Sequence, residues 1–111
     1  MKSMKILLLL VCGVLLLSTA ASAHKVNIFA YAESGTIYSE SYFPDGRAVE
    51  NGKVLVYDNQ DNLLLEGTTD KDGLYSFDIP KIDDLTIVID ASMGHRNSFE
   101  LSKDEVEEAA P

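Results

Sequence analysis

Hydrophobic and polar residues alternate with a period of two along most of the chain after residue 23, which is typical of β-strands. The pattern predicts seven strands, at residues 24–32, 36–43, 53–57, 63–66, 74–79, 85–90 and 98–101. Turn-forming residues separate these strands, as in Pro-Asp-Gly at 44–46 and Asp-Lys-Asp-Gly at 70–73. Short strands with turns about every 8 to 12 residues predict an all-β fold, a small Ig-like or transthyretin-like antiparallel β-sandwich of about seven strands.

The first 23 residues have the three parts of a secretory signal peptide. Lys2 and Lys5 precede an apolar run at residues 6–17, and small residues follow up to Ala23. The run is shorter than the roughly 20 residues of a membrane-spanning helix, so an uncleaved anchor is the weaker alternative. We expect cleavage after Ala23 and export across the inner membrane, to the periplasm or the cell surface.

The single cysteine, Cys12, lies inside this apolar run. A lipoprotein interpretation is disfavoured because Val11 stands where lipid-attachment motifs have a small residue. Cys12 therefore belongs to the signal peptide, and the exported chain has no cysteine for a disulfide.

The exported part has 88 residues, enough for one small domain at residues 24–101. It keeps all 18 Asp and Glu residues but only seven Lys and Arg residues, a formal charge of −11. This charge disfavours binding to nucleic acid and to anionic lipid, although an acidic surface most often serves solubility. The tail at residues 102–111 is acidic, and we expect it to be disordered or to form a short helix that Ser102 caps with Glu105 three residues on.

The chain has only two histidines, His24 and His95, and cleavage after Ala23 makes His24 the first residue. An N-terminal histidine is a bidentate metal ligand, because its α-amine and its imidazole nitrogen close a chelate ring on one ion. The α-amine has a reference pKa of only about 7.7 to 8.0, so a metal ion displaces its proton near neutral pH. We expect a metal site of His24 and His95, provided that the first strand and the loop around residue 95 meet at one end of the sandwich. Each histidine has a simpler explanation, as the residue that follows a cleavage site and as a solvated loop residue.

Imidazole and amine nitrogens suit nickel, copper and zinc, and intrinsic affinity favours Cu(II) over Ni(II). Met93 lies two residues before His95, and its thioether would favour Cu(I), but a methionine more often fills a core. The Asp-Lys-Asp-Gly segment at 70–73 lacks the later glycine and glutamate of a calcium-binding EF-hand loop, so we interpret it as a turn.

Other chemistry finds little support in the sequence. The five tyrosines fall on strands, and we expect them to pack rather than to form a sugar-binding platform. No serine or cysteine has a histidine at a spacing that suggests a catalytic triad, and we do not expect an enzyme.

Two segments carry a resemblance to a known superfamily. AVENGKVLVYD at residues 48–58 and GTTDKDGLYSF at residues 67–77 resemble the carboxypeptidase-regulatory-like, transthyretin-like sandwich superfamily. In that motif Thr-Asp ends a strand before a turn glycine, and Tyr-x-Phe starts the next strand with both rings in the core. The resemblance implies a fold and is nearly silent on function.

A narrower resemblance covers almost the whole exported chain. HKVNIFAY at 24–31, ESYFPDGR at 40–47 and MGHR at 93–96 resemble the extracytoplasmic accessory component of bacterial energy-coupling-factor nickel transporters. It implies a protein that helps to present Ni(II) to membrane nickel transporter subunits, with His24 and His95 as the functional residues. The alternatives are a metal-free structural or adhesion module and a periplasmic copper-binding chaperone.

Overall fold

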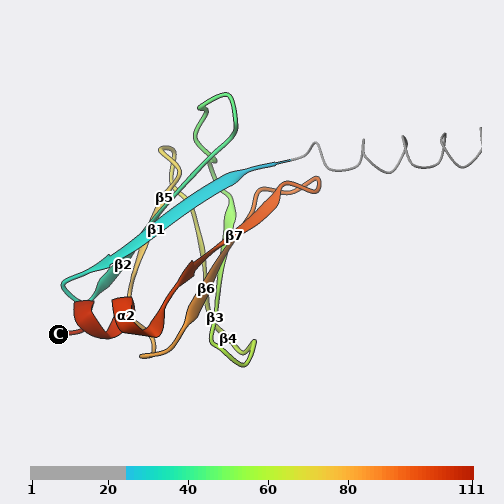
Figure 1. Ribbon diagram of the computed structural model, residues 1–111. Coiled ribbons are helices and arrows are strands. Elements are labelled where there is room, and N and C mark those ends of the chain that lie inside the picture. Colours follow the sequence, from blue (N-terminus) through green and yellow to red (C-terminus); the bar gives the residue numbers. More distant parts are fainter. Residues whose placement is uncertain (1–24) are drawn as a thin grey trace, which may run out of the picture.

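The structure is a computed structural model that describes residues 25–111, and it consists of two packed antiparallel β-sheets (Figure 1). The predicted signal peptide and His24 lie outside the described residues. The elements are β1 (Asn27–Glu33), β2 (Thr36–Tyr42), β3 (Lys53–Tyr57), β4 (Leu63–Thr68), β5 (Leu74–Asp78), β6 (Leu85–Asp90), β7 (Arg96–Leu101) and α2 (Lys103–Ala109). One sheet has the order β1-β2-β5 and the other the order β4-β3-β6-β7. The predicted seven-stranded β-sandwich is confirmed.

The strand bounds differ from the prediction by a few residues. β4 continues to Thr68 and β7 begins at Arg96, so both strands are longer than predicted. The core between the sheets consists almost entirely of aliphatic side chains. Its buried members are Val26, Ala30, Ile37, Val49, Val54, Val56, Phe77, Leu85, Ile87, Ile89, Leu101 and Val106.

The turn at residues 70–73 and the strand β5 that follows it have the predicted motif. Gly73 N donates a hydrogen bond to Asp70 O over 3.0 Å, which closes the turn. Phe77 is buried, Tyr75 is half-buried, and their rings stack with centroids 5.7 Å apart. The expectation that both rings face the core is confirmed.

The acidic tail forms the short helix α2, which is one of the two alternatives expected for it. The Ser102 side chain accepts a hydrogen bond from Glu105 N over 3.2 Å, as in a capping box. Val106 is fully buried, and Gly35 N donates to Ala109 O over 2.6 Å. These contacts fix α2 against the turn between β1 and β2 (Figure 1). Among residues 25–111, no helix has the length and the apolar character needed to cross a membrane.

The two ends of the sandwich are therefore different. One end carries α2 and the β1–β2 turn, whereas the opposite end carries the start of β1 and the tip of the β6–β7 hairpin (Figure 1). This second end carries His95, the candidate metal ligand that lies within residues 25–111.

Candidate functional site

His95 lies at the tip of the hairpin between β6 and β7. Ala91 N donates to His95 O over 2.8 Å, and His95 N donates to Ser92 O over 2.9 Å, so the tip is a closed turn. Three consecutive residues have positive φ there: Ser92 at 68°, Met93 at 53° and Gly94 at 82°. Glycine adopts such a φ readily, whereas a bulky side chain such as that of Met93 does so at a cost.

The His95 ring packs against the loop that follows β2. Its centroid lies 5.7 Å from that of Phe43, with the planes at 81°. The Arg47 guanidinium carbon lies 4.9 Å from the Phe43 ring centroid, and Arg47 Nε donates to Asp45 Oδ2 over 2.7 Å. This hydrogen bond from Arg47 is the main reason why the pKa of Asp45 is below its usual value. Phe43 thus contacts both His95 and Arg47.

A hollow of about 450 Å³ lies where three chain segments meet at this end. Lys25, before β1, lines it together with His95 and the residues of the 43–47 loop. Asn97 Nδ2 donates to Val26 O over 2.8 Å, which ties the start of β1 to β7 just after the hairpin. The first strand and the loop around residue 95 therefore meet at one end of the sandwich. The structure places Lys25, the direct neighbour of His24, in the same hollow as His95.

Met93 does not fill a core. Its side chain is 88% exposed at the hairpin tip. The expectation of core packing is wrong here because a tight turn of left-handed residues projects its middle side chain into solvent. Met93 lines the same hollow as His95.

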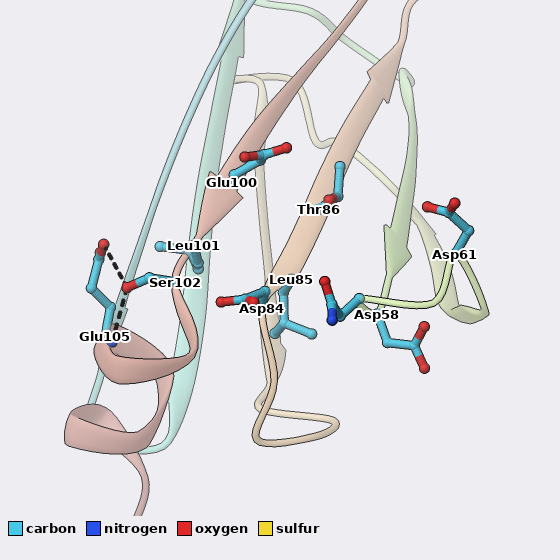
Figure 2. A pocket seen from close by; sticks show the side chains of 10 residues that line it. Asp58, Asp61, Asp84, Leu85, Thr86, Glu100, Leu101, Ser102 and Glu105 are labelled. Atoms are coloured by element: carbon cyan, nitrogen blue, oxygen red, sulfur yellow. Dashed lines mark hydrogen bonds between the residues drawn. The ribbon is translucent and has the colours of Figure 1, made fainter.

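Another hollow lies at the opposite end of the sandwich, where β6 begins, β7 ends and α2 starts (Figure 2). It has about 520 Å³ and is lined by several carboxylates, among them Asp58, Asp61, Asp84, Glu100 and Glu105. The carboxylates of Asp61, Glu100 and Glu105 stand apart around the hollow instead of converging on one point (Figure 2). Within residues 25–111, no group of three or more His, Cys, Asp or Glu side chains is arranged to hold a metal ion.

Asp58 in this hollow has a structural task. Its carboxylate accepts hydrogen bonds from Gln60 N and Asn62 N, both over 2.9 Å, and from Lys81 Nζ over 2.9 Å. The Lys81 ammonium is the largest cause of the strongly lowered pKa of Asp58, and Asp58 in turn raises the pKa of Lys81. The carboxylate organises the polar loop between β3 and β4, as the prediction of a hairpin at residues 58–62 requires.

The sequence interpretation missed the aromatic outer face of the β1-β2-β5 sheet. Tyr31, Tyr38 and Tyr42 lie on strands as expected, but they are 46%, 39% and 40% exposed, so these three do not pack into the core between the sheets. The inward positions of β2 instead carry Ser39 and Ser41, which are buried. The alternation of Ser and Tyr in β2 contained this signal, because small polar and large aromatic residues occupy opposite faces.

The fold and the hollow define a small β-sandwich in which His95, the one histidine among residues 25–111, lies at the end where β1 begins. No protein-family model, no curated protein and no solved structure matches the chain. The resemblance to nickel-transporter accessory components therefore stays a prediction.

Proposed function

We propose that the protein is an extracytoplasmic accessory protein that binds a transition metal, nickel in its natural setting, and presents it to a membrane nickel transporter. The ligands are the α-amine and imidazole of His24 and the imidazole of His95. The observation that carries the proposal is the common hollow of Lys25 and His95. Lys25, the residue next to His24, lines this hollow together with His95, although 70 positions separate Lys25 from His95 in the sequence.

The carboxylates near the hollow support a nitrogen site. Asp45 is paired with Arg47, and Asp90 accepts a hydrogen bond from Ser92 N over 3.0 Å and lies 3.5 Å from Arg96 Nη1. These oxygens already have cationic or amide partners, whereas imidazole and amine nitrogens are ligand types that suit nickel and copper. Three nitrogen ligands leave coordination positions open, which suits an ion that is to be passed on.

Calorimetric titration of the chain that begins at His24 with Ni(II) tests the proposal. We expect one ion per chain, strong weakening in His95→Ala, and strong weakening when one alanine precedes His24, because the chelating amine is then an amide. Met93→Ala is the matched control from the same hairpin, and nickel binding should not change in it.

A folded chain with His24 at its terminus that binds no nickel would refute the metal site. The protein would then be a metal-free module that contacts other proteins, an alternative that the exposed aromatic rings of β1 and β2 favour. A Cu(II) preference that persists when both metals compete at cellular supply ratios would favour the copper chaperone instead. The exposed Met93 thioether beside His95 is the feature that favours that alternative.

A further inference from the structure

The outer face of the β1-β2-β5 sheet carries a contiguous group of exposed apolar rings and side chains. Phe29 is 49% exposed, Tyr31 46%, Tyr38 39% and Leu74 45%. The strand register places these side chains next to one another, since Tyr31 pairs with Tyr38 and Glu40 pairs with both Phe29 and Leu74. They line a hollow of about 400 Å³. An exposed apolar group of this kind marks an interaction site more often than a scattered single residue does.

The rings are held in place before any ligand arrives. Tyr31 and Tyr38 stack with centroids 5.2 Å apart and planes at 20°, and Phe29 lies 6.0 Å from Tyr31. Phe29 also meets Phe99 of β7 edge-on, at 5.4 Å. The rings therefore lose little side-chain entropy when a ligand covers them.

Carboxylates are interleaved with the rings. Glu33, Glu40 and Asp78 lie on the same outer face by strand alternation, and Asp70 borders the hollow. The strands β1, β2 and β5 contain no Lys or Arg at all. Within residues 25–111, the ion pairs are formed by other carboxylates, namely those of Asp45, Asp58, Asp83 and Asp90.

This charge decides which occupant fits. A second copy of the chain would bring one set of carboxylates against another, and anionic lipid or nucleic acid would be repelled. A cationic side chain is favoured by two interactions, one with the aromatic faces and one with the carboxylates between them. We propose that the outer face of the β1-β2-β5 sheet binds a segment of a partner protein that presents Lys or Arg between apolar residues. This site does not depend on the metal site.

The test uses ¹⁵N-labelled chain of residues 24–111, without metal, and two synthetic peptides. The basic probe is acetyl-Val-Lys-Val-Arg-Val-amide and the acidic probe is acetyl-Val-Glu-Val-Glu-Val-amide. We expect millimolar basic peptide to give saturable amide shifts on β1, β2 and β5, and the acidic peptide to give none. The shifts should weaken as salt is added, because exposed charges are screened.

Two variants separate the contributions of rings and charge. Tyr38→Leu and Glu40→Gln should each weaken binding of the basic peptide roughly two- to fivefold, the effect of one exposed cation–π contact or ion pair. Glu66→Gln is the matched control, because Glu66 is exposed on β4 of the other sheet, and binding should not change in it.

Several results would overturn the proposal. They are equal binding of the acidic peptide, peptide shifts confined to another surface, no shift with either peptide, and concentration-dependent shifts of the free chain on this face, which would mean that a second copy covers it. Nickel binding does not enter any of these readouts, so a failed metal titration leaves this proposal standing.

Discussion

Gly73 combines a positive φ with a close approach to another segment's backbone, and its substitution by alanine is therefore a sharp test of the fold. Its φ is +76°, and a Cβ atom there would lie 2.3 Å from Ser41 O and 3.3 Å from Val49 N. The positive φ costs a residue with a Cβ about 1 to 2 kcal/mol. The clash also disturbs two hydrogen bonds: Ser41 N donates to Gly73 O over 2.9 Å, and Val49 N donates to Ser41 O over 3.0 Å.

Each weakened hydrogen bond adds about 0.5 to 1.5 kcal/mol, so Gly73→Ala should lower the free energy of unfolding by about 3 kcal/mol. For a domain of this size, that loss corresponds to a fall in Tm of roughly 12 to 24 °C. Gly46 is the matched control: its φ is +92°, but in the described part of the chain nothing lies within 4 Å of the position of its Cβ. Gly46→Ala should therefore cost only the backbone term of about 1 to 2 kcal/mol.

Urea denaturation of both variants, followed by circular dichroism, measures the two losses. The difference between them isolates the steric contribution at Gly73. Equal losses in the two variants would show that the turn moves away from Ser41 without cost, and the reasoning from close contact would be refuted.

Three further predictions concern the core, a buried hydrogen bond and acid stability. Val106→Ala should cost about 2 kcal/mol in urea denaturation, because Val106 is fully buried and two methyl groups are lost; no loss would mean that α2 does not dock in solution. Thr69→Val should cost about 1 to 3 kcal/mol in the same assay, because Gly52 N donates to Thr69 Oγ1 over 2.8 Å and would lose its buried acceptor; a neutral result would mean that water replaces it. Asp58 has a folded-state pKa far below its usual value because of Lys81, so its stabilising contribution is complete above the unfolded-state pKa of about 3.9 and is lost as pH falls below that value. Tm measured from pH 7 to pH 2 should therefore fall less steeply below pH 4 in Asp58→Asn, and an unchanged slope would contradict this assignment.

The strands were predictable because their alternation is regular and their turns use residues with a clear conformational preference. Ser34 and Gly35 have φ of 50° and 84°, as a two-residue hairpin turn requires. The tail was harder to predict, since its only strong helix signals are the cap at Ser102 and one apolar residue, Val106. The helix exists because Val106 reaches the core, a tertiary contact that no local pattern contains.

The exposure of the aromatic rings could not be derived from alternation alone. Alternation assigns Tyr38 and Ser39 to opposite faces, but it does not say which face the second sheet covers. Ser39 faces inward because its hydroxyl donates to Tyr75 O over 2.8 Å, which satisfies a polar group that burial would otherwise penalise. Hydrophobicity alone would have placed Tyr38 inside.

We expected a metal site only on the condition that the first strand and the loop around residue 95 meet at one end of the sandwich. Lys25 and His95 line the same hollow because β1 lies next to β7 and Asn97 holds Val26 O. That adjacency joins the edges of two different sheets, and it depends on the whole sandwich closing. The sequence could therefore name the histidines, but it could not show whether the chain around them converges.

Both proposed sites lie along β1, so the distance between them is set by the length of this one strand. The chain enters β1 at the hollow of His95, and the outward side chains of the same strand, Phe29 and Tyr31, form the aromatic face. An extended chain rises about 3.3 Å per residue, so Lys25 and Phe29 are separated by about 13 Å at most. A partner segment bound on the aromatic face would therefore lie close to the end of the sandwich that carries His95. If His24 and His95 bind nickel as proposed, a partner bound on the aromatic face would be held next to the ion, which is the arrangement that transfer of the ion to that partner requires.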